Sequence, residues 1–327
     1  MITIAEPKTK TTKTKTRTVA LTLDLVGVNR ARLQALAIEC LKAETIGIKA
    51  AIAKDAGELL ARFPSFSTYA AFKKCFGLSY FASVNSSAKI EKSAKRKVDT
   101  LILYLAASQN AGIELCMFAT KECRELCLVA SGRAMMESGR DPSKQSIAIA
   151  RIIKSWIFHF RADIARAVLS HEITSKGKAA RKRERSFAVR LNGTSDIDHS
   201  ETIREFPGVS FYDYTKRPLP AKLPANYSIC YSFANFSPAR VKQYQKAVSM
   251  GLNIAVPVIA SDFEKAVSLP FAFNADRDDL RHLDKERGQL AILKVKRTPN
   301  LQANQANAFV LDFAGVQKLA RLLSLQS

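Results

Sequence analysis

From about residue 99 onward, short apolar, β-branched and aromatic runs alternate with stretches of helical periodicity. The runs predict strands at 101–108, 187–193, 209–214, 227–233, 253–259 and 289–295, with a weaker candidate at 308–313. The stretches between them predict helices at about 142–171, 238–250, 261–267 and 315–325. Strands that alternate with helices favour parallel βαβ units. We therefore expect an α/β fold that is (β/α)-barrel-like and irregular, with an open doubly wound sheet as the alternative.

The residues before this region differ in charge and in the spacing of their apolar side chains. The first 18 carry one acid, Glu6, against five cations, which predicts a disordered basic tail: Lys8, Lys10, Lys13, Lys15 and Arg17. Residues 19–98 hold Ala, Leu, Ile and Lys at helical spacing, which predicts a helical N-terminal region. We divide the chain accordingly into the tail (1–18), the helical region (19–98) and a (β/α)-barrel-like catalytic domain (99–327).

The charge balance points to a polyanionic partner. Lys and Arg total 51 against 29 Asp and Glu, a formal net charge of +22. The simplest partner for such an excess is a polyanion, of which nucleic acid is the commonest. The charge fits DNA and RNA alike, and double-stranded DNA is the partner that we expect. We expect no membrane association, because no apolar run approaches the length of a membrane span, and the N-terminus lacks the apolar segment of a signal peptide. These features predict a cytoplasmic protein.

One segment, SKGKAARKRER at 175–185, concentrates this charge and predicts an exposed basic loop. Its cations are candidates for contacts to the nucleic-acid backbone: Lys176, Lys178, Arg181, Lys182, Arg183 and Arg185. A solvated surface without a partner is the alternative.

Three of the six cysteines lie within twelve residues, at Cys116, Cys123 and Cys127. In a reducing compartment such a cluster indicates metal binding or catalysis more often than disulfides. Cys123 and Cys127 are spaced to share a helix face, so the trio can converge on zinc, with a [4Fe–4S] cluster as the alternative cofactor. Of the histidines, His199 is the candidate fourth ligand or acid–base group, whereas His282 is expected at the surface. Buried or redox-active thiols without a metal remain the other interpretation.

Polar residues crowd the ends of the predicted strands. In parallel α/β folds the carboxyl ends of strands form the site, because the loops there converge. Candidates for binding a substrate are Asn192, Gly193, Thr194, Ser195, Tyr214, Thr215, Lys216 and Asn235. Asp196 and Asp213 follow or end neighbouring strands, so one can attack a sugar C1′ or act as base while the other handles a proton. The alternative is that Asp196 caps a helix and Asp213 pairs with a cation. No GxGxxG or GxxxxGK[ST] motif supports dinucleotide or NTP binding.

Three motifs, CxxASGRA, RLNGTSDI and FYDYTK, resemble a family of phage and plasmid proteins named after a numbered mycobacteriophage gene product, over roughly residues 100–296. That resemblance implies an origin in a mobile element. More distantly, the segment FYDYTKRP is similar to queuine-type guanine transglycosylases, which are (β/α)-barrels with a Cys-rich metal site and two catalytic aspartates. Their phage relatives exchange guanine in DNA for a 7-deazaguanine such as preQ0, which shields the genome from restriction.

The transglycosylase resemblance implies Asp213 as nucleophile and Asp196 as general acid–base group, with a 7-deazaguanine base as the small substrate. The chain departs from that family in its cysteines, because the family's CxC-x2-C motif lies late in the chain and these cysteines follow the first predicted strand. Radical-SAM barrels hold their cluster at that position. Two alternatives therefore stand beside base exchange: an iron–sulfur, radical-SAM-like enzyme acting on nucleic acid, and a nucleic-acid-binding protein with a structural metal.

Overall fold

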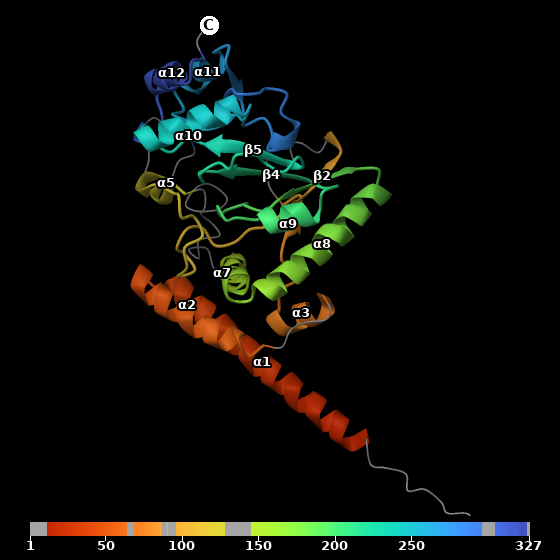
Figure 1. Ribbon diagram of the computed structural model, residues 1–327. Helices are drawn as coiled ribbons and strands as arrows, with labels where there is room; N and C mark the ends of the chain where they lie inside the picture. The colour runs from red at the N-terminus through yellow and green to blue at the C-terminus, as the bar shows by residue number, and fades with distance from the viewer. Residues whose placement is uncertain are drawn as a thin grey trace, which may run out of the picture.

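The computed structural model describes residues 12–63, 69–86, 90, 96–127, 145–295 and 305–325, with the side chains of the first helix from Val26 onward. Figure 1 shows the N-terminal helices at one end of the molecule, the helices α7 (Gln145–Phe160) and α8 (Ala162–Lys182) next to them, and the sheet beyond that pair. The C-terminal helices cover the remaining part of the sheet.

The sheet has eight strands in the order β1-β2-β3-β4-β5-β6-β8-β7. All neighbouring strands are parallel except the pair β1 and β2. The strands are β1 (Ser83–Val84), β2 (Val98–Ile102), β3 (Ser186–Arg190), β4 (Ser210–Thr215), β5 (Tyr227–Ser232), β6 (Ile254–Val258), β7 (Ala272–Asn274) and β8 (Leu290–Lys294). Five of the six main strands expected from the sequence are present close to their expected bounds, whereas the first lies at 98–102 and shares only two residues with the expected 101–108. The candidate at 308–313 contributes one isolated bridge, Val258 to Leu311.

The expected barrel is not confirmed, because the sheet is open. Its edges are β1 and β7, strands of two and three residues that each pair with one neighbour among the described strands. Closing a barrel requires the first and last strands to pair along a staggered register. The fold is therefore a mixed α/β structure built on a mostly parallel open sheet.

The helices differ from expectation in two places. The stretch expected to be one helix at 142–171 is two helices, which meet at Arg161, and the second runs through most of the segment expected to be a basic loop. The first helix begins at Thr12, so part of the expected tail is helical, while residues 1–11 lie outside the described chain. The helices are α1 (Thr12–Lys42), α2 (Ile46–Leu60), α3 (Tyr69–Phe76), α5 (Lys121–Glu125), α7 (Gln145–Phe160), α8 (Ala162–Lys182), α9 (Ser200–Glu205), α10 (Pro238–Ser249), α11 (Phe263–Val267) and α12 (Phe313–Leu322).

The break at Arg161 has a local cause. Its backbone leaves the helical region, with φ −135° and ψ 60°. Its guanidinium donates hydrogen bonds to the carbonyl oxygens of Leu60 (3.0 Å) and Phe63 (2.7 Å), just after α2. These contacts satisfy the free carbonyls that follow a helix end and tie α2 to the start of α8.

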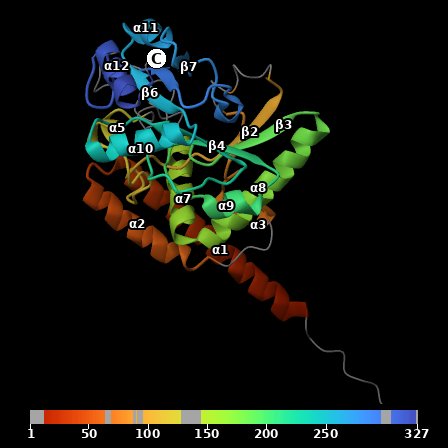
Figure 2. The same cartoon turned by 45° about the horizontal axis from the view of Figure 1, so that its top comes forward.

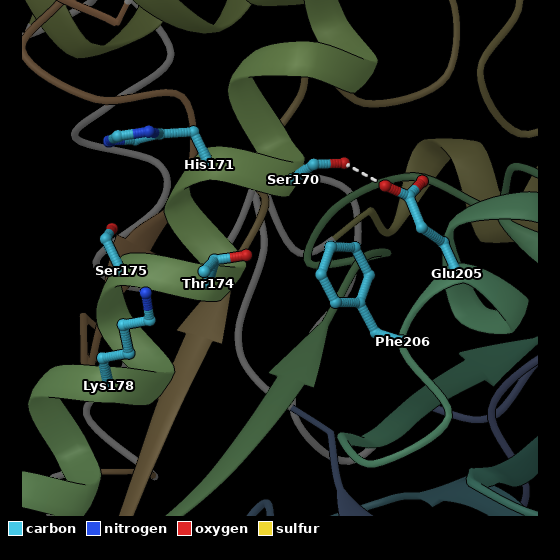
Figure 3. A pocket seen from close by; sticks show the side chains of 7 residues that line it. All are labelled: Ser170, His171, Thr174, Ser175, Lys178, Glu205 and Phe206. Carbon is cyan, nitrogen blue, oxygen red and sulfur yellow. Dashed lines mark hydrogen bonds between the residues drawn. The ribbon is translucent and has the colours of Figure 1, made fainter.

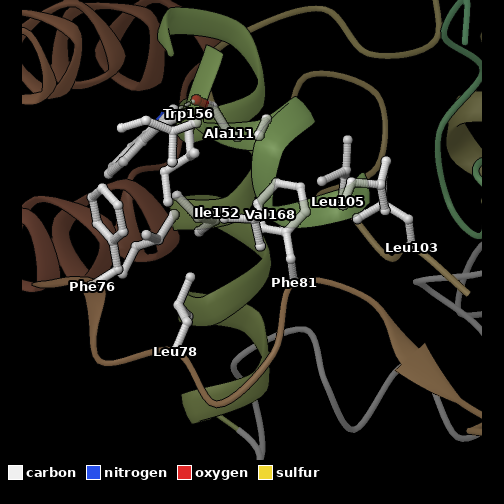
Figure 4. Packing of buried hydrophobic residues seen from close by; sticks show 14 of the residues in the cluster. Phe76, Leu78, Phe81, Leu103, Leu105, Ala111, Ile152, Trp156 and Val168 are labelled. Atoms are coloured by element: carbon white, nitrogen blue, oxygen red, sulfur yellow. Dashed lines mark hydrogen bonds between the residues drawn. The ribbon is translucent and has the colours of Figure 1, made fainter. Parts of the chain in front are cut away.

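Alternate residues of each strand face the helices. Leu101, Val189 and Phe211 pack with α7, α8 and the N-terminal helices in one continuous core. Figure 4 shows part of it, with Trp156 against Phe76 and Ala111. The indole N–H of Trp156 donates to the carbonyl of Ala111 at 2.7 Å. The N-terminal helices thus share one hydrophobic core with the sheet.

A second core lies under α10, α11 and α12, against strands β5, β6 and β8. The intervening residues of the strands point to the opposite face, where Ile102, Ala188 and Tyr212 pack on Leu280. That face is covered by the segment 275–284, which contains the short 3-10 helix η4 (Arg281–Leu283). Among the elements that the structure describes, the α-helices named above thus cover one face of the sheet, and the segment 275–284 with Ile90 covers part of the other.

The first half of α1 projects beyond the rest of the molecule, as Figure 2 shows from a second direction. Within the residues that the structure describes, no helix has the combination of length and apolar character that a membrane crossing requires.

Candidate active site

The loop that carries the cysteines runs from the end of β2 to the short helix α5. It is held from within by Arg124, whose guanidinium donates to Ser108 and to Glu114, both at 2.7 Å. The other carboxylate oxygen of Glu114 accepts from the amide of Cys116 at 2.7 Å. At Gly112, with φ of 73°, a Cβ would lie 2.0 Å from the carbonyl oxygen of Lys49 in α2, so only glycine allows this approach.

Helix α5 places two of the thiols. Its N-cap residue Thr120 accepts a hydrogen bond from the amide of Cys123 at 3.2 Å, a normal helix start. The helix ends at Glu125, so Cys127 lies just past it and does not share a helix face with Cys123 as expected.

The loops after β2 and β3 meet at this point. The amide of Asp196 donates to the carbonyl of Leu115 at 2.8 Å, and the sulfur of Cys116 lies 3.9 Å from the carbonyl oxygen of Thr194. Burial raises the pKa of the Cys116 thiol to about 12. Three neighbouring groups add to that rise: Cys127, Asp196 and Cys123. Cys123, Cys127 and Asp196 are therefore all within electrostatic range of the Cys116 thiol.

The thiols suit a soft metal in their chemistry, since thiolates are the usual ligands of zinc and of iron–sulfur clusters. Their positions do not yet form a coordination shell. Across the described ranges, no three side chains of His, Cys, Asp or Glu converge closely enough to hold a metal ion. The trio must draw together for a metal to bind.

His199 does not join the thiols. It is buried at the N-cap of α9, its ring packs edge-on against Phe158 at 5.3 Å, and burial lowers its pKa to about 4. Its Nε2 has no hydrogen-bond partner within the described structure. The expected fourth ligand thus faces α7, so a metal held by the three thiols would take a different one.

Asp196 is the carboxylate at the centre of the site. It accepts a hydrogen bond from the Thr215 hydroxyl (2.6 Å) and another from the amide of Lys216 (2.8 Å), both at the end of β4. Burial raises its pKa even though these two hydrogen bonds favour the charged form. Arg240 in α10 completes the junction by donating to the carbonyls of Lys216 and Phe118, both at 2.6 Å.

Asp213 lies inside the protein, with no exposed surface. One carboxylate oxygen accepts from the amide of Asn192 at 2.8 Å, and the other accepts from the Tyr227 hydroxyl at 3.3 Å. Burial raises its pKa to about 7, Arg190 opposes the rise and Asp196 adds to it. Asp196 therefore acts electrostatically on Asp213, and of the two carboxyl groups only Asp196 has exposed surface.

The expected substrate-binding residues after β3 largely hold their own loop together. The side-chain oxygen of Asn192 accepts from the Ser195 hydroxyl (3.0 Å) and the Ile197 amide (2.9 Å), and Thr194 donates to Leu105 at 2.5 Å. A Cβ on Gly193 would come within 2.9 Å of Leu103, Tyr104 and Ile102, so this glycine allows the loop to pack against the β2 end.

The remaining expected residues lie in different places. Asn235 caps the turn into α10, since its side-chain oxygen accepts from the Ser237 amide at 3.0 Å. The ammonium of Lys216 lies 5.1 Å from the centre of the Phe309 ring. Tyr214 points to the opposite face of the sheet, where its hydroxyl contacts Asp279. Thr215 and Lys216 thus belong to the Asp196 site and Tyr214 does not.

The cations at 175–185 are not in a loop. Lys176, Lys178, Arg181 and Lys182 are exposed along the last turns of α8. The next residues are tied down: Arg183 (2.7 Å) and Arg185 (2.8 Å) both pair with the buried carboxylate of Asp99 in β2. The helix continues to Lys182, and Gly177 and Ala180, which lie between the cations, are buried. The many cations in the sequence of this segment made it look like an exposed loop.

This basic end of α8 leads directly into β3, at the amino edge of the sheet, whereas Asp196 follows β3 at the carboxyl edge. The two are separated by a five-residue strand, about 16 Å at 3.3 Å per residue.

Between α8 and the end of α9 lies an open hollow of about 530 Å³ (Figure 3). It is lined by Ser170, His171, Thr174, Ser175, Lys178, Glu205 and Phe206.

One group of polar residues escaped the sequence analysis. Asp278, Asp279 and Arg281 are buried against the sheet, and His282, expected at the surface, stacks on Tyr212 with ring centres 5.0 Å apart. The segment DRDDLRHLDK has the composition of an exposed loop, and its single buried leucine, Leu280, is the only sign that it covers the sheet.

Comparison with known proteins supports one of the two resemblances. No curated protein and no solved structure matches the chain. Residues 81–310 match the family described as Gene product 88, a phage gene-product family. The matched segment begins before β1 and extends past β8, so it includes every described strand and all the loops of the candidate site. The chain therefore belongs to the Gene product 88 family.

Proposed function

We propose that the protein modifies DNA by base exchange, a glycosyl transfer at the carboxyl edge of its sheet. One observation carries the proposal: two carboxyl groups from neighbouring strand ends, Asp196 and Asp213, are both enclosed at the carboxyl edge of the sheet, where burial raises the pKa of each and Asp196 adds to the rise at Asp213. Pairs of carboxyl groups with different environments are how enzymes divide nucleophilic and acid–base work in glycosyl transfer. The net charge of +22 supports a polyanionic substrate.

The geometry favours the reverse of the roles that the transglycosylase resemblance implies. Asp196 has exposed surface, so it is the candidate nucleophile. Its carboxylate oxygen would bond to C1′ of a deoxyguanosine, while the C1′–N9 bond breaks and its electron pair leaves with guanine. Guanine takes up a proton as it departs. An incoming 7-deazaguanine then loses a proton, bonds to C1′ and releases the carboxylate.

Asp213 is the candidate for carrying that proton, because a pKa of about 7 lets a carboxyl group hold and release a proton near neutral pH. It is fully buried in the free protein, so the loop from Asn192 to Asp196 must shift before it reaches a base. If duplex DNA is the substrate, the base must also leave the stack.

The cysteines supply a second element of the proposal. Cys116, Cys123 and Cys127 would hold zinc, or a [4Fe–4S] cluster as the alternative. Bound there, the metal would fix the loop and place positive charge beside Asp196. The exposed cations of α8 would contact phosphates some distance from the reacting base, because they lie at the amino edge of the sheet. Such a substrate implies a cytoplasmic location.

The test is exchange of labelled guanine into or out of duplex DNA by the purified full-length protein without ATP, read by nucleoside mass spectrometry. Asp196→Asn should abolish exchange and Asp213→Asn should reduce it strongly. The matched control is Asp198→Asn, two residues away, an exposed carboxylate paired with Arg217 at 2.9 Å. Undiminished exchange by Asp196→Asn would remove the assignment. An anaerobically purified brown protein that absorbs near 400 nm without exchange activity would favour radical chemistry instead.

A further inference from the structure

An exposed methionine lies in the loop that carries the cysteines. Met117 follows Cys116 and precedes helix α5, and 72% of its surface is exposed. Among the large apolar residues that the structure describes, it is the most exposed. Single apolar side chains at the surface are common in soluble proteins, so exposure alone assigns no role to Met117. Its setting in the loop distinguishes it.

Met117 occupies the tip of a tight turn. The amide of Ala119 donates to the carbonyl of Cys116 at 2.9 Å, so Met117 and Phe118 are the two central residues of this turn. The carbonyl of Phe118 accepts a hydrogen bond of 2.6 Å from the guanidinium of Arg240 in α10. The backbone on both sides of Met117 is therefore held in place, while its side chain extends into solvent.

The turn lies beside the candidate nucleophile. The carbonyl of Leu115 accepts from the amide of Asp196 at 2.8 Å, and the sulfur of Cys116 lies 3.9 Å from the carbonyl oxygen of Thr194. Met117 is two residues from Leu115, so the two Cα atoms lie within about 8 Å of each other. The loop thus presents an apolar side chain next to the Asp196 site, at the carboxyl edge of the sheet.

Base exchange in duplex DNA creates a need for such a side chain. A guanine that turns out of the helix leaves a gap, and the unstacking of its neighbours costs free energy. Apolar side chains, methionine among them, offset that cost in other DNA-binding proteins by entering between base steps. Methionine is unbranched and polarizable, so it adapts to a gap of irregular shape.

We propose that Met117 enters the base stack of duplex DNA and fills the space left by the guanine that turns toward Asp196. This inference rests on the proposed function, because it takes duplex DNA as the substrate and Asp196 as the reacting group. Met117 is a positioning residue: it takes no part in bond making or breaking, and it acts by keeping the gap in the stack open.

The test compares guanine exchange by the full-length protein on duplex DNA and on single-stranded DNA of the same sequence. Met117→Ala should lower the rate on the duplex about tenfold and leave the rate on the single strand within about twofold, because no paired stack has to open there. Met117→Leu should restore most of the duplex rate, since leucine also enters base steps. The matched control is Ile48→Ala, which shortens another exposed apolar side chain, in α2, and should change neither rate.

A second measurement does not depend on exchange. In a duplex with 2-aminopurine beside its one guanine, the fluorescence of 2-aminopurine rises when the stack opens. At saturating protein, we expect this rise with the unchanged protein, Met117→Leu and Ile48→Ala, and its loss in Met117→Ala.

The outcomes separate the two proposals. If Met117→Ala slows exchange equally on both substrates, or changes neither duplex exchange nor fluorescence, the role of Met117 is wrong and base exchange stands. A rise that depends on Met117, in a protein that exchanges no guanine, would overturn the proposed function and keep the insertion. If the unchanged protein binds the duplex and the fluorescence does not rise, Met117 does not enter the stack.

Discussion

The hydroxyl of Thr215 donates a hydrogen bond of 2.6 Å to the carboxylate of Asp196, across the gap between the end of β4 and the loop after β3. The amide of Lys216 donates to the other oxygen at 2.8 Å. Two donors from one strand end thus fix a carboxylate that belongs to the neighbouring strand's loop. This contact positions the candidate nucleophile, and it is also what limits the rise of the Asp196 pKa on burial.

Thr215→Val removes one of these donors and keeps the shape of the side chain. Because the hydroxyl favours the charged carboxylate, its loss should raise the pKa of Asp196 further. In the base-exchange assay we expect a rate about tenfold lower at neutral pH, with the acidic limb of the rate–pH profile moved to higher pH. Ser268→Ala is the control, because its hydroxyl bonds to the carbonyl of Lys265 at the end of α11, outside the site. An unmoved acidic limb in Thr215→Val would show that Asp196 does not titrate in the reaction.

Asp213 makes stability depend on pH. Its pKa is about 7 in the folded protein and near 3.8 when unfolded, so between these values the folded protein binds the proton more tightly. The contribution of this group is therefore complete below about pH 4 and is lost as pH rises through 7. Asp213→Asn should abolish that loss, making the variant more stable than the unchanged protein at pH 8 by about 2–4 kcal/mol and similar to it at pH 4. Urea unfolding at both pH values measures the difference. Parallel pH curves for the two proteins would contradict the raised pKa.

The sequence predicted the strands of this fold better than its closure. The six main strands are apolar runs of five or six residues, long enough to be recognised by composition. The edge strands β1 and β7 have two and three residues, too few to show an alternating pattern in the sequence. The open edges of the sheet could therefore not be predicted from the sequence. The break at Arg161 depends on carbonyls of Leu60 and Phe63, about 100 residues earlier, so no local pattern could reveal it.

The same division holds for the candidate site. The rule that parallel strands end at one edge of the sheet predicts that the cysteine loop lies near Asp196. The amide of Asp196 donates a hydrogen bond to Leu115, next to Cys116 in that loop. The use of Asn192 and Ser195 within their own loop depends on a turn that residue types alone do not define. Asp279 and Arg281 are buried in ion pairs, and Asp279 pairs with Arg190, which is distant in the sequence. From composition alone, such a charged segment is expected at the surface.

Glu172 in α8 is a second buried anion whose loss should be costly. Its carboxylate accepts from the amides of Phe81 (2.8 Å) and Ala82 (2.7 Å) and from the Tyr69 hydroxyl, so it ties the segment before β1 to the helices. Glu172→Ala would leave two buried amides unmet, and we expect a loss of about 3 kcal/mol in the free energy of unfolding. The exposed Glu201, paired with Arg166 at 3.2 Å, is the control, and Glu201→Ala should cost less than about 0.5 kcal/mol. Comparable losses in the two variants would mean that the Glu172 contacts contribute little.

The thiol cluster predicts how metal content responds to mutation. If the three cysteines hold one metal, Cys116→Ser and Cys123→Ser should each lower the zinc or iron stoichiometry of the purified protein from about one site to near zero. Chelation of the unchanged protein should lower its melting temperature, because the metal binds the folded state. Cys75→Ala is the control, since that thiol is buried in α3 with other core side chains. Equal metal content in all the proteins would show that the cysteines near Asp196 are not ligands.

The exposed cations of α8 should set the salt dependence of DNA binding. Lys178, at the hollow between α8 and α9, and Lys182, one turn further on, are exposed and free to meet phosphates. Removing both as Lys178→Ala and Lys182→Ala should reduce the slope of log K against log salt by about 2, because each phosphate contact contributes about 0.9. Fluorescence anisotropy with a labelled duplex measures this slope. Lys54→Ala, an exposed cation on α2, should leave it unchanged. Arg185→Ala should instead lower stability, because the Arg185 guanidinium pairs with the buried carboxylate of Asp99. Burial raises the pKa of Asp99, and hydrogen bonds, including the one from Arg185, keep it below its usual value. An equal loss of slope in Lys54→Ala and in the α8 variants would mean that DNA responds to net charge alone and not to this surface.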